Sequence, residues 1–258
     1  MNNMKRTAIV TGASQGIGRA TAIRLARDFG AVVLVARNAA KLADTAAAVE
    51  KAGAQALVID VDLSTPAAPD LVVCKTLDAF GRIDALVNIA GDVPQIDLFQ
   101  MTDAQWDAGM SLKFHGARRL TIRAWEALKA SQGSVIVTSG NSAAVPKAGF
   151  AAVAAINAAI VSLAKAFAER GIEDGVQVNS VLPGPVMTGR RESFLGKWSA
   201  AHDMSVEDAK SKFLDAAGIS RYGQPEEIGE LMAFLVSPAA KWMTGSAIRM
   251  DGGEIKAM

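Results

Sequence analysis

Apolar residues along the 258-residue chain follow two alternating patterns: short continuous runs, and longer stretches with helical spacing. The short runs are rich in β-branched residues, as is typical of buried parallel strands. They are Thr7–Val10, Ala31–Ala36, Gln55–Ile59, Asp84–Val87, Ser134–Thr138, Gly175–Val181 and Ser246–Met250. The helical stretches begin at Ile17 and continue at Ala39–Ala52, Ala67–Phe80, Thr102–Ala130, Gly149–Arg170, Thr188–Ala217 and Pro225–Leu235.

Strands separated by helices of this length form right-handed βαβ units. The predicted fold class is therefore α/β, a doubly wound parallel sheet covered by helices on both faces. No linker, repeat or low-complexity tract interrupts the alternation, which predicts a single domain over residues 1–258. Thr102 has the residue type and position of a helix N-cap.

Ligands of such sheets bind beyond the carboxyl ends of the strands, where the strand order switches. Four segments fall at that edge: Gly12–Gly18, Asn88–Gly91, Ser139–Ser142 and Pro183–Thr188. The poorly patterned stretch 188–217 follows the last of them and is a candidate substrate lid. Its apolar residues either line a pocket or pack as one face of a helix on the body; they are Met187, Phe194, Leu195, Trp198 and Met204.

Three glycines separate the first strand from the first helix: Gly12, Gly16 and Gly18. Glycine permits a tight turn and a close approach of backbone to a bulky anion. The following helix N-terminus directs N–H groups and a positive dipole end at a pyrophosphate. The spacing, G-x-x-x-G-x-G, differs from the G-x-G-x-x-G of the standard fingerprint. The pattern favours a dinucleotide loop, and a turn that only packs the helix is the alternative.

Charge and composition narrow the class of partner. The 27 basic and 26 acidic residues nearly cancel, which argues against nucleic acid or an anionic membrane surface. The single Cys74 excludes an intramolecular disulfide, fits a reducing compartment, and is predicted to be a small buried residue. No run approaches ~18 uninterrupted apolar residues and no signal peptide is recognisable, so a cytoplasmic location is expected. No cluster has metal-ligand spacing, so no metal is predicted.

Several motifs in order along the chain resemble the short-chain dehydrogenase/reductase family. They are Thr11–Gly18, Asp62-Leu63, Asn88–Gly91, Asn179–Thr188, Arg221–Ile228 and Asp251–Gly253. The resemblance covers essentially the whole chain. It implies a Rossmann-like seven-stranded sheet, an NAD(P)(H) cofactor, a homotetramer, and hydride transfer between a small carbonyl compound and an alcohol. In the family the two helices corresponding to 102–130 and 149–170 form the interface between subunits.

The resemblance also implies which residues hold the cofactor. The pyrophosphate loop would comprise Gly12, Ser14, Gln15, Gly16, Ile17 and Gly18. Asp62 and Leu63 would contact the adenine, and Asn88, Ala90 and Gly91 would lie beside the cofactor. The nicotinamide would rest on Pro183, Gly184, Val186 and Thr188.

The residue after the second strand distinguishes the two cofactors. A carboxylate there would bind the ribose 2′-hydroxyl of NAD. This chain has Ala36 followed by Arg37. An arginine without a competing acid favours the 2′-phosphate of NADP through charge-assisted hydrogen bonds. We therefore expect NADP, with NAD as the alternative and a merely solvated Arg37 as the structural alternative.

The family's Asn-Ser-Tyr-Lys catalytic tetrad is absent. The family-like run Ala158–Leu163 sets a register in which Gly140, Val153 and Asn157 stand at the serine, tyrosine and lysine positions. The family's pattern from Trp106 to Gly116 places Lys113 at the asparagine position. Valine cannot exchange a proton, so the family's acid–base route, typically worth ~10²–10⁴-fold in rate, is excluded. Lys113, in the predicted helix 102–130, stands at the position of the family's asparagine. Asn157, in the predicted helix 149–170, stands at the position of the family's lysine.

Two hypotheses on Lys113 remain open. It extends toward the space left by Val153, bonds Asn157 or the ribose, and acts as a relocated acid, because desolvation lowers the pKa of a lysine. Alternatively, it points outward or forms an ion pair. Ser139 and its neighbour Ser142 are further candidates for bonding a substrate carbonyl.

Two classes of function follow from these observations. The first is an NADP-dependent oxidoreductase of the short-chain type that uses an atypical proton route, with Lys113, a serine or a water as the acid. The second is a catalytically inactive NAD(P)-binding homologue that acts as a regulatory or partner-binding subunit.

Overall fold

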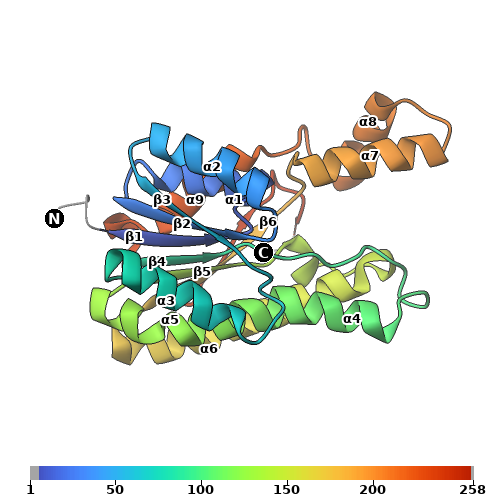
Figure 1. The fold of residues 1–258 in the computed structure, drawn as a ribbon. Coiled ribbons are helices and arrows are strands. Elements are labelled where there is room, and N and C mark those ends of the chain that lie inside the picture. The colour runs from blue at the N-terminus through green and yellow to red at the C-terminus, as the bar shows by residue number, and fades with distance from the viewer. Residues whose placement is uncertain (1–5, 257–258) are drawn as a thin grey trace.

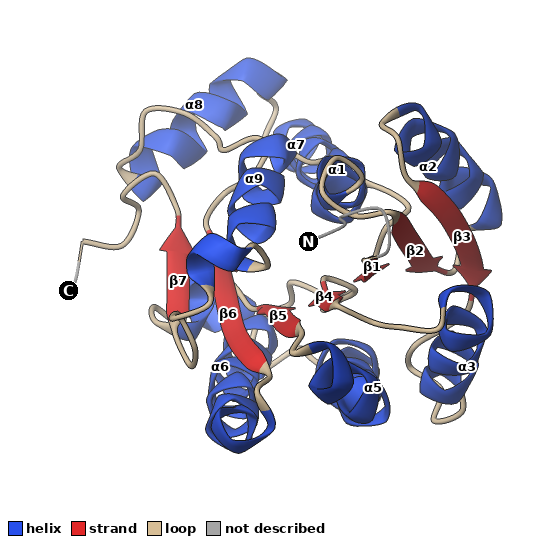
Figure 2. Cartoon of the chain, turned by 90° about the vertical axis from the view of Figure 1, so that its left-hand side faces the viewer, coloured by secondary structure: helices blue, strands red, loops and turns tan. Residues whose placement is uncertain are grey.

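The computed structural model describes residues 6–256, which form a parallel sheet of seven strands covered on both faces (Figures 1 and 2). The order across the sheet is β3-β2-β1-β4-β5-β6-β7, and every neighbouring pair is parallel. The strands are β1 (Thr7–Thr11), β2 (Ala31–Ala36), β3 (Gln55–Asp60), β4 (Ala85–Asn88), β5 (Ser134–Thr138), β6 (Gln177–Pro183) and β7 (Ala247–Met250). The predicted doubly wound α/β fold is confirmed.

The helices form one layer on each face of the sheet, with α1, α2 and α9 on one side and α3, α5 and α6 on the other (Figure 1). They are α1 (Gly16–Leu25), α2 (Ala39–Lys51), α3 (Ala68–Phe80), α4 (Asp103–Gly109), α5 (Ala117–Ser131), α6 (Ala151–Asp174), α7 (Gly189–Ala201), α8 (Val206–Ala217) and α9 (Pro225–Leu235). Alternate residues of β1 enter opposite cores: Ile9 packs with the α3, α5 and α6 side, and Ala8 and Val10 with the α1, α2 and α9 side.

The strand order switches between β1 and β4, the central pair of the sheet. The connections that follow β1 and β4 run in opposite directions across the sheet. A crevice therefore opens between them at the carboxyl ends of the strands. The loops after β1, β4, β5 and β6 all end at that edge. This placement brings residues far apart in sequence to one site.

The predicted continuous helix over Thr102–Ala130 is wrong in its middle. Thr102 caps α4 as expected, accepting a hydrogen bond from the Gln105 backbone N–H, while Thr102 N–H donates to Gln105 Oε1 at 3.0 Å. Between α4 and α5, however, Met110–Gly116 forms a π-helix, which holds Lys113. A periodicity of 3.6 residues cannot reveal this insertion, and π-helical turns are frequent at functional sites.

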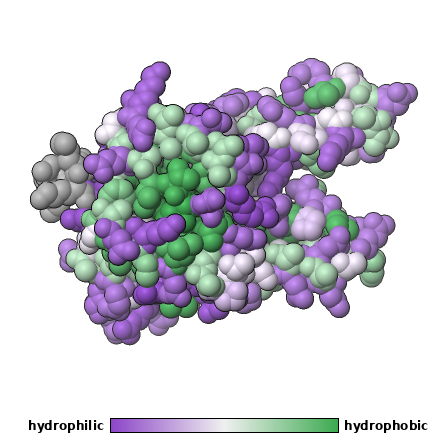
Figure 3. Space-filling view, viewed as in Figure 1, coloured by the Kyte–Doolittle hydropathy of each residue, from purple (hydrophilic) through white to green (hydrophobic). Residues whose placement is uncertain are grey.

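Helices α7 and α8 form a lobe that projects away from the body, with a hollow between it and the lobe that contains α4 (Figures 1 and 3). The apolar side chains of the stretch 188–217 pack mostly against one another. Leu195, Ala209 and Tyr222 are buried there among Met187, Phe194, Trp198, Met204, Phe213 and Leu214. Packing rather than a pocket therefore explains these residues, and α7 and α8 pack mainly against each other.

The prediction that Cys74 is buried is wrong, because its side chain is exposed on α3. The buried face of α3 carries Val72, Val73 and Thr76, and Cys74 falls outside it. The thiol lies 3.9 Å from Arg123 Nη2. The hydrophobic character of cysteine did not decide its position; the helical register of its neighbours did.

The helical segment Ala148–Asp174 is long and apolar enough, by length and composition, to cross a membrane. In this fold it contains α6, which packs against β5 and β6 through Ile156, Ile160 and Ala164. A helix that covers a sheet satisfies the same criteria, so this finding is weak evidence for a membrane span.

Gly171 tests how closely α6 packs on the turn that leads to β6. A Cβ atom at Gly171 would lie 2.1 Å from the carbonyl oxygen of Val176. We expect Gly171→Ala to lower the free energy of unfolding by ~1–3 kcal/mol, the usual cost of overpacking, in urea denaturation. The matched control is Gly196→Ala in α7, where no atom lies within 4 Å of the added carbon. That variant should gain ~0.5–1 kcal/mol, and a loss at both positions would contradict the packing argument.

Candidate functional site

Three loops meet closely at the carboxyl edge of the sheet. Gly12 and Gly16 have φ of +68° and +55°, in the left-handed region that favours glycine. A Cβ on Gly12 would lie 3.1 Å from Ala90 N, and one on Gly16 would lie 3.3 Å from Thr188 Cγ2. A Cβ on Gly18 would lie 2.1 Å from the carbonyl oxygen of Gly12. Glycine is therefore required at these positions because the backbone of the first loop packs against the loop after β4, against the turn after β6 and against itself.

The first turn of α1 has the properties of an anion site. Its N-cap, Gln15, makes no capping hydrogen bond, and the first turn contains no acidic residue. Ser14 and Ile17 are partly exposed in the same loop. Uncapped N–H groups at the positive end of a helix fit a pyrophosphate, so the residues present fit the dinucleotide that the sequence predicted.

The loop after β4 is tied to the first loop by Thr11. Its hydroxyl oxygen accepts hydrogen bonds from Ile89 N at 2.9 Å and Ala90 N at 3.0 Å. Asn88 is buried and donates Nδ2 to Thr121 Oγ1 at 3.2 Å, and its Oδ1 has no partner among the described residues. An unpartnered buried oxygen at this edge is consistent with a site that a ligand completes.

Asp62 and Leu63 lie where the adenine end of the cofactor was predicted. Asp62 Oδ1 accepts a hydrogen bond from Ser64 N at 2.9 Å, which holds the pKa of this carboxyl below its usual range. Leu63 is buried, and a Cβ on Gly116 would lie 2.9 Å from its carbonyl oxygen. An ionised acceptor beside an apolar side chain suits an adenine ring and its amine.

Arg37 is joined by a second cation that the sequence analysis missed. Lys41 lies one helical turn later, near the start of α2, and donates Nζ to Gln15 Oε1 at 2.9 Å. The sequence signal was a basic residue four positions after Arg37. Sequence alone also indicated no competing acid, but the loop after β4 brings Asp92 Oδ2 to 3.9 Å from Arg37 Nη2. This long, exposed pair is weak, so the balance of charge still favours a phosphate.

The predicted nicotinamide turn is held rigidly. Val186 pairs with Gly223 as a β-bridge, and a Cβ on Gly184 would lie 2.7 Å from Asp251 Cα. Pro183 ends β6, and Thr188 caps α7 by accepting from Arg191 N. The turn therefore connects the sheet directly to the start of α7.

Two of the predicted tetrad positions, Lys113 and Asn157, form a hydrogen-bond network with Ser139 and Ser142. Lys113 Nζ donates to Asn157 Oδ1 and to the carbonyl oxygen of Ser139, the latter at 3.4 Å. Asn157 Nδ2 donates to Ser142 Oγ at 2.9 Å, and Ser139 Oγ donates to the Asn157 carbonyl at 2.8 Å. Lys113 therefore extends inward to Asn157. Of the described residues, no carboxylate forms an ion pair with it.

Two glycines provide the space for this network. A Cβ on Gly91 would lie 2.9 Å from Lys113 Cγ and Cδ, and one on Gly140 would lie 2.8 Å from Asn157 Nδ2. A side chain at position 140, the predicted position of the family's serine, would displace the Asn157 amide. Asn157 and Lys113 therefore depend on glycine at positions 140 and 91.

Burial, together with the charge of Arg190 in the first turn of α7, lowers the pKa of Lys113 to about 8. Ser139 is buried and its hydroxyl hydrogen is used by Asn157. Ser142 is partly exposed and, among the described residues, donates to no acceptor. Lys113 and Ser142 are consequently better placed than Ser139 to donate a proton to a bound molecule.

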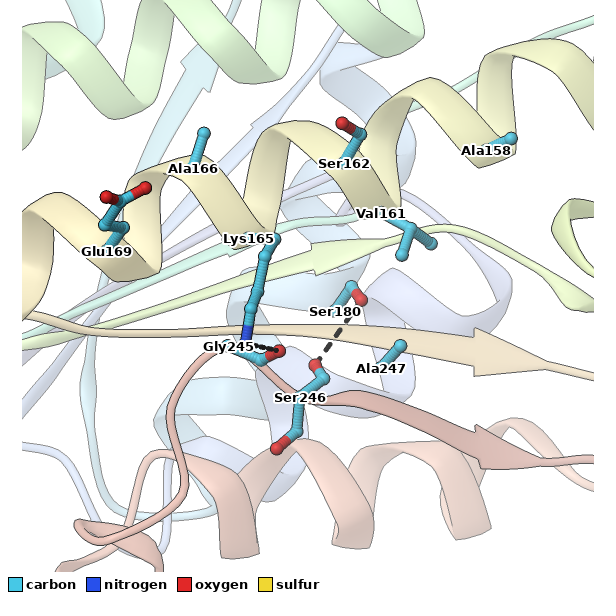
Figure 4. Close-up of a pocket in the computed structure, with 10 residues that line it drawn as sticks. All are labelled: Ala158, Val161, Ser162, Lys165, Ala166, Glu169, Ser180, Gly245, Ser246 and Ala247. Atoms are coloured by element: carbon cyan, nitrogen blue, oxygen red, sulfur yellow. Dashed lines mark hydrogen bonds between the residues drawn. The ribbon is translucent and has the colours of Figure 1, made fainter. Parts of the chain in front are cut away.

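A separate hollow lies between α6 and β7 and has a volume of about 520 Å³ (Figure 4). Lys165 crosses it and donates to the Gly245 carbonyl at 3.3 Å. Its lining contains none of the predicted site residues. No group of three potential metal ligands occurs within residues 6–256.

Comparisons with known proteins agree with this geometry. Residues 12–254 match the family model described as enoyl-(acyl carrier protein) reductase. The short-chain reductase protein NovJ of Streptomyces niveus is 31% identical over 97% of this chain and 94% of its own. A 3-oxoacyl-[acyl-carrier-protein] reductase of Synechocystis is also 31% identical, over 97% of both chains. The crystal structure of L-sorbose reductase from Gluconobacter frateurii with NADPH and L-sorbose superposes with a TM-score of 0.94, at 30% identity, covering 98% of this chain and 97% of that one.

Arg37 provides a test of the phosphate end of the site. We expect Arg37→Ala to weaken NADPH binding ~10–100-fold, because a charge-assisted hydrogen bond contributes ~1.5–3 kcal/mol. NADH has no 2′-phosphate, so its affinity should change less than about twofold. Quenching of tryptophan fluorescence measures both affinities. Arg27→Ala removes the same charge from an exposed position and serves as the control. Equal losses for both cofactors would contradict the assignment.

Proposed function

The chain belongs to the short-chain dehydrogenase/reductase family of oxidoreductases, and from this premise we propose that it is an NADP-dependent reductase of small carbonyl compounds in which Lys113 replaces the family's tyrosine as proton donor. The observation that carries the proposal is the inward position of Lys113, held by Asn157 Oδ1 and Ser139 O. NADPH bound to the structurally related L-sorbose reductase supports the choice of cofactor.

When bound, NADPH supplies the hydride. The chain's own residues would hold it: the Gly12–Gly18 loop and the α1 N-terminus would bind the pyrophosphate, and Arg37 and Lys41 would bind the 2′-phosphate. The Lys113 ammonium then donates a proton to the substrate oxygen as negative charge develops there. A pKa of about 8 keeps most of the lysine protonated near neutral pH while making it a stronger acid than an ordinary lysine.

Asn157 has a positioning role in this proposal. It cannot supply the charge of the family's lysine, but its Oδ1 orients the ammonium and its Nδ2 holds Ser142. The segment 188–217 would act as the lid, because it begins at the nicotinamide turn and projects over the hollow in Figure 3. Closure over the substrate would exclude water and strengthen the electrostatic contribution of Lys113.

Removal of the amine tests the proposed acid. We expect Lys113→Met to lower kcat for NADPH-dependent reduction across a panel of aldehydes and ketones by ~10²–10⁴-fold. NADPH affinity should stay within about twofold, because the hydrogen bonds of Lys113 go to Asn157 and Ser139 and not to the residues proposed to hold the phosphates. Lys75→Met, an exposed position on α3, is the matched control. Unchanged turnover in Lys113→Met would show that solvent or a serine donates the proton, and no turnover in the wild type would favour the inactive homologue.

The same assay should show a pH dependence of defined sign. The ammonium is the acid, so it is present below the pKa of about 8 and is lost as the pH rises through that value. The rate of carbonyl reduction by the wild-type protein should therefore fall above about pH 8. The residual rate of Lys113→Met should not fall above this pH. If it does, a group other than Lys113 causes the fall.

We also propose a homotetramer, supported by the family relationship and by the exposed apolar residues on the outer helices. Ile122 on α5 is 53% exposed. Light scattering after size exclusion should give a mass about four times the 26.9 kDa of the chain. Ile122→Glu should lower this mass, whereas Leu71→Glu on α3 should not, because α3 does not belong to the proposed interface. A monomer mass for the wild type would refute the proposal.

A cytoplasmic location remains part of the proposal. It is supported by the single cysteine, which fits a reducing compartment, and by the near balance of 27 basic and 26 acidic residues, which fits a small-molecule substrate better than nucleic acid or a membrane surface.

A further inference from the structure

The surroundings of the Lys113 amine differ from those of a buried lysine that stays protonated. A buried lysine ammonium is usually paired with a carboxylate. Here both acceptors are neutral: the Asn157 side-chain oxygen on α6 and the Ser139 carbonyl at the end of β5. The stem of the lysine lies against Gly91, which allows the amine to reach this position.

The number of acceptors matches the neutral amine. An ammonium has three N–H donors and no lone pair, whereas a neutral amine has two N–H donors and one lone pair. Asn157 and Ser139 provide two acceptors, so both N–H groups of the neutral amine are satisfied and its lone pair remains available. The ammonium would have a third N–H without a partner among the described residues.

The charged groups around the amine favour the same state. Arg190 faces it from the first turn of α7, and Asp92 is paired with Arg190 at 3.1 Å. From β5 and α6 only neutral groups contact it. Desolvation and a neighbouring cation are the two means by which proteins make a lysine nucleophilic toward carbonyl compounds.

We propose that the ε-amine of Lys113 is a nucleophile that captures small aldehydes and ketones reversibly as an imine, an activity that needs no nicotinamide cofactor. The nitrogen lone pair attacks the carbonyl carbon, and the carbonyl electron pair moves to the oxygen. The nitrogen then gives up one proton and the oxygen gains one, which yields a neutral carbinolamine. The C–O bond then breaks and water leaves after protonation of the hydroxyl. The product is a protonated imine, formed from one carbonyl compound, one amine and one proton with loss of one water. Nothing is oxidised or reduced, and hydrolysis reverses the step.

Neighbouring residues fit this chemistry. Ser142, bonded to the Asn157 amide, is the partly exposed hydroxyl of the network and can relay the proton that the departing oxygen needs. Val153 stands one helical turn before Asn157, so no phenol competes for the carbonyl oxygen at that position. The imine would form in the space that the family's tyrosine leaves.

The test is imine trapping on the full chain without any nicotinamide. The protein is incubated with cyclohexanone and sodium cyanoborohydride at about pH 7.5, and the rate at which each lysine gains a cyclohexyl group is measured by peptide mass spectrometry. About one quarter of Lys113 is neutral at this pH, against about one in a thousand for an ordinary lysine. We therefore expect Lys113 to be labelled at least ~10-fold faster than exposed Lys51 and Lys75.

Two controls separate nucleophilicity from folding. Lys113→Arg keeps a cation and its donors but cannot form an imine, so labelling at this position should disappear while Lys75 is labelled as before. Retained NADPH binding shows that the variant is folded. In the wild type, the labelling rate at Lys113 should rise with an apparent pKa of about 8, unlike the rate at Lys75.

Labelling of Lys113 no faster than of Lys75, or a pH profile shared with Lys75, would overturn the inference. The trapping experiment contains no NADPH, so its outcome is independent of the reductase assay. Fast labelling without NADPH-dependent turnover would leave imine formation established and the proposed reductase refuted. The converse result would refute only the imine.

Discussion

The amide of Asn157 is the constraint on which the rest of the site depends. Its Oδ1 accepts a hydrogen bond from Lys113 Nζ, and its Nδ2 donates one to Ser142 Oγ. The Asn157 side chain is buried, and Lys113 and Ser142 are partly buried. A buried amide or amine without a partner costs ~1–3 kcal/mol or more, so neither side chain is stable at its position without the other. Gly91 and Gly140 are needed as well, because a Cβ at Gly91 would clash with Lys113 and a Cβ at Gly140 would clash with Asn157. Lys113, Asn157 and the two glycines therefore form one connected arrangement.

The basic side chains at the two ends of the site differ in how strongly their surroundings favour the charged form. Arg37 and Lys41 are exposed, so their charge persists and is available to a phosphate. Lys113 is surrounded by neutral acceptors and faces Arg190, so its charge is weakly held. The switch in strand order between β1 and β4 brings these environments to one edge of the sheet. One end is suited to hold an anion, and the other to exchange a proton.

Most of the fold was predictable because neighbouring residues carry the pattern. The apolar run Ala31–Ala36 coincides with β2, and Thr102 caps α4 as its residue type indicated. The inward position of Lys113 was one of two hypotheses, suggested by the exchange of residue types with Asn157. The features that sequence missed are contacts between distant elements: Asp92 beside Arg37, and Lys41 on Gln15. The π-helix at Met110–Gly116 was missed because a short apolar stretch has no signature for an extra residue per turn.

A lysine with a pKa of about 8 has two chemistries near neutral pH, and the position of α7 influences which one dominates. The ammonium donates a proton, whereas the neutral amine attacks a carbonyl carbon. Burial is one cause of the low pKa, and Arg190 is the other. Because Arg190 belongs to the first turn of α7 and also donates to the Gly91 carbonyl at 3.1 Å, the position of α7 determines how close this cation lies to Lys113. A displacement of α7 away from the body would raise the pKa and favour the ammonium, and an approach would favour the nucleophile. The helix proposed to close over a substrate would thus also tune the protonation of Lys113.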